Sequence, residues 1–275
     1  MKGISSYVFV KQRLRAPLLD TMVRAGAETI EIFGARDHFD YSDRGTVREI
    51  GAWFKSSGVP LNSLHAPMFS DYEWGASGGP PVNIVDSDKR RRIASMDEIK
   101  RAIEVAEQLP FRFLVQHIGT GGEAWDPHKF EYALTALEHL RAFARPLGVA
   151  LLVENMPNQL STPERLLELL AAGHFDDIGV CFDVGHAHVM TNVSDAFQQL
   201  KPRILSSHVH DNKGDRDAHL WPGDGTIDWD EAFGLLRAAP QVPPLMLEID
   251  GDAQQNVEQK LREALQKLDT VKAAS

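Results

Sequence analysis

The chain has 275 residues, and its 29 Lys and Arg residues against 39 Asp and Glu residues give a formal net charge of −10. This acidic balance argues against a general affinity for nucleic acid. The single cysteine, Cys181, excludes an intramolecular disulfide, and we expect a protein of the reducing cytoplasm. No apolar stretch approaches the length of a transmembrane helix, and the N-terminal one is too short for a signal peptide, so we expect no membrane partner.

Strand-like apolar runs alternate with helix-like segments along the whole chain. The runs predict eight strands, at residues 3–9, 27–34, 61–65, 111–117, 149–154, 178–183, 203–208 and 245–249. Helical patterns cover residues 14–24, 46–57, 88–108 and 126–145, a further helix opens at Thr162-Pro163, another is capped by Asp228, and the last ends near residue 270. This alternation predicts parallel βαβ units, and the length suits one (β/α)₈ barrel domain over residues 1–275.

Acidic or imidazole side chains follow the apolar runs at the point where each predicted strand ends. They are His65, His117, Glu154, Asp183, His208 and Glu248, with His186 three residues beyond Asp183. In a (β/α)₈ barrel the carboxyl ends of all strands meet at one face, and that face holds the active site. We therefore expect these side chains to converge on a metal site.

The residues on the last four strands form the most plausible set of metal ligands. Three carboxylates and one imidazole, Glu154, Asp183, His208 and Glu248, can bind one divalent cation, with Mn²⁺ as the first choice and Mg²⁺, Co²⁺ and Zn²⁺ as alternatives. The competing interpretation is that each residue is a separate helix cap or surface charge. Four such residues at consecutive strand ends favour the metal site, because buried charges without partners are costly.

A second set of residues is open to two interpretations. His65, His117, His186, Asp217 and His219 lie at strand ends or in the loop after the seventh strand, and such residues can bind zinc. We favour neutral histidines that hydrogen-bond substrate hydroxyl groups or orient the first carboxylates. Arg216 would hold an anionic group of the substrate, or else it is a solvated surface charge.

Two loops carry weaker signals. The segment from residue 66 to 88 is longer than usual for a strand-to-helix connection, so Tyr72 and Trp74 would wall a substrate pocket or plug the barrel rim. Gly223 and Gly225 would let backbone amides approach a ligand closely, or they would serve a turn. We interpret His210 and Asp211 as polar groups of the loop after the seventh strand. Cys181 lies inside an apolar strand-like run, so we interpret it as a packed core residue.

The chain resembles the xylose isomerase-like TIM-barrel superfamily over nearly its whole length. The resemblance is carried by Val-Glu-Asn at residues 153–155, Phe-Asp-Val-Gly-His at 182–186, His-Val-His-Asp-Asn at 208–212 and Asp-x-His-x-x-x-Gly-x-Gly at 217–225. This superfamily includes sugar and sugar-phosphate isomerases and epimerases, enzymes of inositol catabolism and the endonuclease IV repair enzymes.

The resemblance implies an isomerase or epimerase acting on a sugar, a sugar phosphate or a keto-polyol. In the sugar epimerases, the residues that correspond to Glu154, Asp183, His208 and Glu248 bind one catalytic cation, and the two glutamates also exchange protons with the substrate. The substrate would be contacted by His65, His117, His186, Arg216, His219 and Trp74. Barrels of this superfamily are often dimers or tetramers, so a homo-oligomer is an open expectation.

Three alternatives remain open at this point. Endonuclease IV holds three zinc ions, and its nine ligand positions correspond here to His65, His117, Glu154, Asp183, His186, His208, Asp217, His219 and Glu248. The acidic balance, with only one basic run at residues 90–92, favours sugar chemistry over DNA cleavage. A lyase or dehydratase acting on an oxidised sugar would use the same residues, and a metal-binding barrel without catalysis is the remaining possibility.

Overall fold

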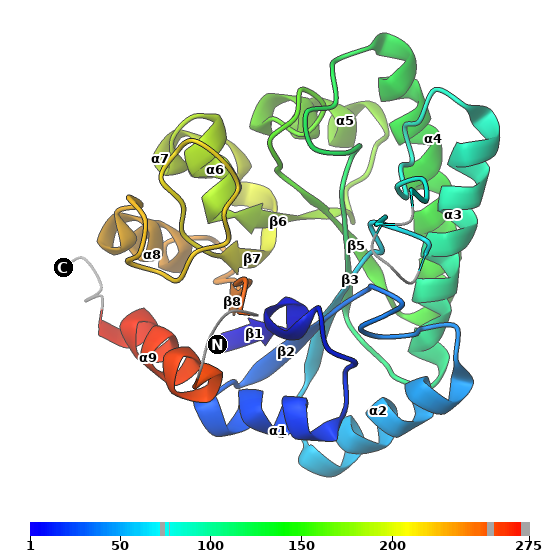
Figure 1. The fold of residues 1–275 in the computed structure, drawn as a ribbon. Coiled ribbons are helices and arrows are strands. Elements are labelled where there is room, and N and C mark those ends of the chain that lie inside the picture. Colours follow the sequence, from blue (N-terminus) through cyan, green and yellow to red (C-terminus); the bar gives the residue numbers. More distant parts are fainter. Residues whose placement is uncertain (72–74, 77, 252–255, 271–275) are drawn as a thin grey trace.

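Eight parallel strands close into a barrel in the computed structural model, which describes residues 1–71, 75–76, 78–251 and 256–270. Each strand pairs with the next, and β8 pairs with β1, as Figure 1 shows. The strands are β1 (Lys2–Ser5), β2 (Thr29–Phe33), β3 (Leu61–His65), β4 (Phe113–Gln116), β5 (Ala150–Glu154), β6 (Gly179–Asp183), β7 (Ile204–Val209) and β8 (Leu245–Leu247). The (β/α)₈ barrel predicted from the apolar runs is confirmed.

Helices surround the strands as an outer ring (Figure 1). They are α1 (Ala16–Ala25), α2 (Arg44–Ser57), α3 (Lys89–Glu104), α4 (Pro127–Ala144), α5 (Pro163–Ala172), α6 (Val184–Met190), α7 (Val193–Leu200), α8 (Trp229–Arg237) and α9 (Val257–Thr270). Short 3₁₀ helices cover Ser6–Phe9, Val105–Glu107, Arg145–Leu147 and Lys201–Arg203. No helix among the described residues is long and apolar enough to cross a membrane.

The helix starts follow from capping residues that the sequence displays. The Thr162 hydroxyl accepts a hydrogen bond from the backbone N–H of Arg165, and Pro163 occupies the first turn of α5, as predicted. Asp228 likewise accepts from the N–H of Glu231 and caps α8, which confirms its expected role. These caps fix where the loops before α5 and α8 end.

The prediction for the first strand was wrong in its extent, and one helix was not predicted. The first strand ends at Ser5 and not at residue 9, because Ser6–Phe9 forms a 3₁₀ helix whose start is capped by the Ser5 hydroxyl. The helix α6 begins directly after β6, with Asp183 as its N-cap residue, and no helix was predicted there. Asp183 therefore caps a helix, which was the alternative to metal binding. Its side chain also lies close to His208 and belongs to a group of possible metal ligands.

The long connection from β3 to α3 contains one isolated antiparallel bridge, between Phe69 and Pro81. This bridge brings the beginning of the connection next to its later part. Tyr72 and Trp74, which we expected to wall a substrate pocket or to plug the barrel rim, lie outside the described residues. Their predicted role stays a prediction.

Candidate metal centre and active site

The barrel brings together the acidic and imidazole residues predicted at its strand ends. His65, Glu154, Asp183 and His208 belong to β3, β5, β6 and β7, whereas His117 and Glu248 directly follow β4 and β8. Nearly all of these side chains are buried. Ordinary βαβ geometry thus produces one polar centre at the carboxyl-end face of an otherwise apolar barrel.

Four of these residues, Glu154, Asp183, His208 and Glu248, form what we call the carboxylate site. The Nδ1 atom of His208 lies 2.9 Å from Glu154 Oε1, 3.3 Å from Glu248 Oε2 and 3.8 Å from Asp183 Oδ2. One ligand atom from each residue lies within 4.8 Å of those of the other three. The expected set is therefore assembled around one point.

The charges in the carboxylate site are strongly coupled. Burial alone would lower the pKa of His208, but Cys181, Glu248, Glu31 and Glu154 raise it well above its usual range. Burial alone would raise the pKa of Glu154, but the imidazoles of His208 and His117 lower it well below its usual range. The protein thus keeps carboxylates ionised in an environment where an isolated charge would be very unfavourable, so the site requires a compensating cation or proton.

The donor set fits a divalent cation. Three carboxylates and one imidazole supply the oxygen-rich coordination that Mn²⁺, Mg²⁺ and Co²⁺ accept, and Zn²⁺ also tolerates it. The Glu248 Oε1 atom is buried without a hydrogen-bond partner among the described residues. A bound ion or ligand at the carboxylate site would complete the coordination of this oxygen.

Glu31, in the middle of β2, is a member of this centre that the sequence analysis missed. Its carboxylate is fully buried, and its two oxygens lie 3.0 and 3.2 Å from Nε2 of His208. The hydroxyl of Ser63 donates a further hydrogen bond of 2.6 Å to Glu31. A carboxylate that accepts the Nε2–H of a histidine fixes the ring orientation and leaves Nδ1 facing the carboxylate site.

His65 and His117, together with Glu154, form a second group beside the carboxylate site. The Nε2 atoms of the two histidines are 3.2 Å apart, and that of His117 is 3.0 Å from Glu154 Oε2. The Nδ1–H of His65 donates to the carbonyl oxygen of Ala66, so its Nε2 faces His117 and Glu154. Glu154 connects this group to the carboxylate site.

A third group contains His186, Asp217 and His219. The Nε2 atoms of the two histidines lie 3.0 and 3.2 Å from Asp217 Oδ2, and each Nδ1 faces a backbone carbonyl oxygen. Burial opposes protonation, but Asp183 and Asp217 raise the pKa of His186 to about 10, and Asp217 raises the pKa of His219 to about 9. His219 adopts a left-handed backbone conformation with φ of 43°, which is uncommon outside glycine and marks a locally constrained position.

His210 also belongs to this centre, although we had interpreted it as a loop residue. It is fully buried, its Nε2 lies 3.1 Å from a carboxylate oxygen of Asp183, and its ring stacks on His219 at 4.0 Å and 18°. A bound ion lies close to the plane of each coordinating imidazole, so two nearly parallel stacked rings cannot both coordinate one ion well. The geometry therefore favours His210 as a hydrogen-bond donor to Asp183. Its ring packs between His219 and Gly185, where any side chain larger than glycine's would collide with it.

The loop after β7 uses its glycines for its own packing. Gly223 N–H donates to the buried carboxylate of Asp211, and a Cβ at Gly225 would lie 2.2 Å from the carbonyl oxygen of Asn212. Asp211 also accepts from the N–H groups of Asn212 and Ile227 and from Trp229 Nε1. The turn interpretation of the glycines is thus the better one, and Asp211, which we had interpreted as a polar group of this loop, is a buried acceptor that holds the loop together.

Two further sequence predictions are placed differently. Arg216 is exposed and makes no hydrogen bond or ion pair with the described part of the chain, so its contact with an anionic substrate stays a prediction. Cys181 is fully buried in β6, as expected for a core residue.

Comparisons with known proteins agree with this geometry. Residues 19–271 match the model of the xylose isomerase-like TIM barrel family. The chain belongs to this family. The resemblance drawn from the four motifs is therefore confirmed.

Two relatives illustrate the range of the family. An uncharacterized protein of Methanocaldococcus jannaschii is 31% identical over 184 residues, which cover 63% of this chain and 59% of that protein. The match thus spans less than two thirds of that relative. The fructoselysine 3-epimerase of Shigella flexneri is 24% identical over 210 residues, covering 74% of this chain and 73% of that enzyme.

Solved structures resemble the whole barrel. A D-tagatose 3-epimerase-like protein superposes with a TM-score of 0.79 at 25% identity, over 98% of this chain and 97% of that one. The IOLI protein, whose structure is described with a binding zinc atom, gives a TM-score of 0.75 at 19% identity, over 98% and 96% of the two chains. At that lower identity the likeness concerns the fold.

Proposed function

We propose that the protein isomerises or epimerises a sugar or keto-polyol, with Glu154 and Glu248 as the proton-transfer pair and one divalent cation at the carboxylate site. The single observation that carries the proposal is the convergence of three buried carboxylates on His208 Nδ1. The similarity to a fructoselysine 3-epimerase and to a D-tagatose 3-epimerase-like protein supports sugar chemistry. Mn²⁺ is the first ion to test, followed by Zn²⁺, Co²⁺ and Mg²⁺.

The two glutamates suit proton exchange on a carbon next to a carbonyl group. Glu154 ends β5 and Glu248 follows β8, yet both approach the same nitrogen of His208. Glu248 Oε1 has no hydrogen-bond partner among the described residues, so it is free to accept a proton. A carboxylate on each side of one carbon can remove a proton from one face and return it to the other, which inverts that carbon.

The remaining residues orient the substrate and the ligands. A bound cation would polarise the substrate carbonyl and the neighbouring hydroxyl group. His117 and His186, which lie beside Glu154 and Asp217, would hydrogen-bond substrate hydroxyl groups. Glu31 and His210 hold His208 and Asp183 in position, so the ligands need little rearrangement when the ion binds.

Deuterium exchange tests this proposal directly. The Mn²⁺-loaded protein is incubated in D₂O with D-fructose, D-tagatose, D-allulose and a keto-inositol, and loss of the proton next to the carbonyl is followed by NMR. We expect exchange with at least one of these compounds, and a loss of at least about 100-fold in Glu154→Gln and in Glu248→Gln with unchanged circular dichroism. Near-normal exchange in either variant would contradict the assigned mechanism.

A zinc-dependent phosphodiesterase is the second candidate function. The His65 and His117 group and the His186, Asp217 and His219 group each present Nε2 atoms toward a shared carboxylate, which is the arrangement that two further zinc ions would need. The formal net charge of −10 speaks against a DNA substrate. Cleavage of a duplex containing one abasic site by the zinc-loaded protein, and no exchange with ketoses, would favour this second function.

A further inference from the structure

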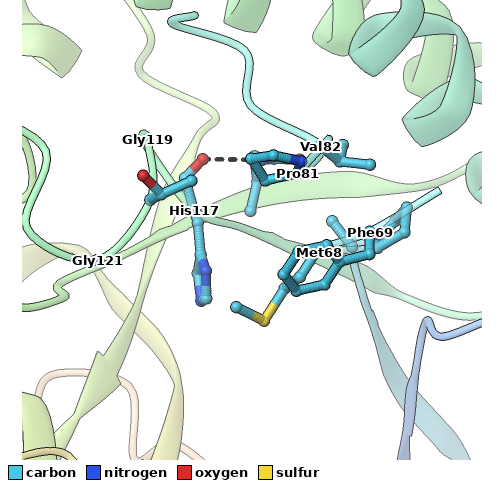
Figure 2. Close-up of a pocket in the computed structure, with 11 residues that line it drawn as sticks. Met68, Phe69, Pro81, Val82, His117, Gly119 and Gly121 are labelled. Carbon is cyan, nitrogen blue, oxygen red and sulfur yellow. Dashed lines mark hydrogen bonds between the residues drawn. The ribbon is translucent and has the colours of Figure 1, made fainter. Parts of the chain in front are cut away.

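A cavity of about 160 Å³ opens beside the metal centre. It lies between the loop that follows β3 and the loop that follows β4. Figure 2 shows Met68, Phe69, Pro81 and Val82 on one side and Gly119 and Gly121 on the other, with the ring of His117 between them. The proposed mechanism uses none of these residues except His117.

The cavity is connected to the reaction centre through His117. The Nε2 atom of this residue is 3.0 Å from Glu154 Oε2, while the same side chain lines the cavity. A substrate whose reacting carbons lie at Glu154 therefore extends past His117 into the cavity if it carries a further group on that side.

The residues that line the cavity favour the binding of an apolar group. Apolar atoms form most of the lining, and Met68, Phe69, Pro81 and Val82 are among the residues that contribute them. Some of the polar groups are already engaged, because the Thr120 hydroxyl donates to Glu123 and the amide nitrogen of Gln116 donates to the carbonyl oxygen of His117. The amide oxygen of Gln116 is buried without a hydrogen-bond partner among the described residues, so the wall keeps one unsatisfied acceptor beside the His117 ring. A group with several hydroxyls would lose more hydrogen bonds to water there than these few partners could replace.

The size of the cavity restricts the group further. A cavity of about 150 Å³ lined by apolar side chains is known to hold one benzene molecule. We propose that the substrate of this enzyme is a sugar derivative that bears one compact apolar group, the size of an aryl ring, and that this group binds in the cavity beside His117. The position of the sugar in this inference rests on the proposed function. The binding of the apolar group in the cavity does not depend on it.

Gly121 offers a way to close the cavity without disturbing the fold. A Cβ at this position would meet no atom within 4 Å, and its backbone φ lies outside the left-handed region that its neighbours Gly119 and Gly122 occupy. Gly121→Leu therefore adds a bulky side chain, without a clash at its Cβ, to a residue that lines the cavity. Gly234 in α8 has equally open surroundings and does not line the cavity, so Gly234→Leu is a matched control.

Hydroxamates test the proposal, because the hydroxamate group chelates divalent cations whatever its substituent. Affinities of acetohydroxamate, benzohydroxamate and 3-phenylpropionohydroxamate for the Mn²⁺-loaded protein are measured by calorimetry. We expect at least one aryl compound to bind about 10-fold or more tightly than acetohydroxamate, as burial of a phenyl ring predicts. This advantage should disappear in Gly121→Leu and persist in Gly234→Leu, while acetohydroxamate binds all three proteins equally. Equal affinities in the unaltered protein, or an aryl advantage that survives in Gly121→Leu, would overturn the proposal.

A metal-independent probe separates this inference from the proposed function. Fluorobenzene binding is followed by ¹⁹F NMR in the presence and absence of Mn²⁺, with the same three proteins. Binding to the unaltered protein and to Gly234→Leu, but not to Gly121→Leu, supports the apolar cavity even if acetohydroxamate fails to bind and the metal centre is wrong. No binding of fluorobenzene to the unaltered protein would overturn the inference.

Discussion

Replacing Glu31 by Gln should weaken metal binding although Glu31 is not itself a predicted ligand. The carboxylate receives the Nε2–H of His208 at 3.0 and 3.2 Å and the hydroxyl of Ser63 at 2.6 Å. Gln has nearly the same shape but no charge, so it keeps one acceptor and loses the charge-assisted bond that fixes the imidazole. Loss of such an orienting partner commonly costs about 10- to 100-fold in metal affinity. That range corresponds to about 1.4 to 2.8 kcal/mol.

The assay is a calorimetric titration of the metal-free protein with Mn²⁺, repeated with Co²⁺ so that the absorption spectrum reports the ligand geometry. Glu49→Gln, at an exposed position of α2, is the matched control and should bind both ions normally. A merely structural role for Glu31 would lower the melting temperature and leave the affinity and the Co²⁺ spectrum unchanged. That outcome would refute the reasoning.

Two further predictions concern protonation and the loop after β7. Metal binding should release protons, because in the metal-free protein the surrounding carboxylates raise the pKa of His208 and a bound cation must displace that proton. The apparent affinity should therefore rise with pH through the neutral range, and titrations in buffers of different ionisation enthalpy should give different heats; identical heats would contradict this. Asp211→Ala should lower the free energy of unfolding by about 3 to 5 kcal/mol, because it leaves several buried donors of the loop without an acceptor. Asp224→Ala, at an exposed position of the same loop, should change it little, and equal urea denaturation midpoints for the two variants would show that the Asp211 bonds are not stabilising.

The strand ends could be predicted from the sequence because a parallel barrel imposes one direction on every strand. A polar residue that terminates an apolar run, such as Glu154 or Asp183, must then face the shared catalytic end. Glu31 was not predicted as a site residue because it lies in the middle of the run Thr29–Phe33 and not at its end. Its partner His208 is 177 residues away, so only the closed barrel shows that its charge is balanced.

Local backbone structure was harder to predict where polar side chains compete with regular structure. The hydroxyl of Ser5 caps a 3₁₀ helix, and Asp183 caps a helix of only seven residues, which is too short to show a clear apolar period. The glycines at 223 and 225 gave a signal that fits an anion-binding loop as well as a tight turn. Asp211 favours the turn, because its carboxylate accepts the N–H of Gly223 and that of Ile227, two residues beyond Gly225.

The metal content of the purified protein tests the central claim most directly. Elemental mass spectrometry is applied to protein prepared without added metal and after exchange against Mn²⁺, alongside the Asp183→Asn variant. We expect one exchangeable divalent cation per chain, lost or greatly weakened in Asp183→Asn, whose side chain belongs to the carboxylate site. The absence of a stoichiometric cation under both conditions would contradict it, and about three tightly held zinc ions per chain would instead favour the phosphodiesterase.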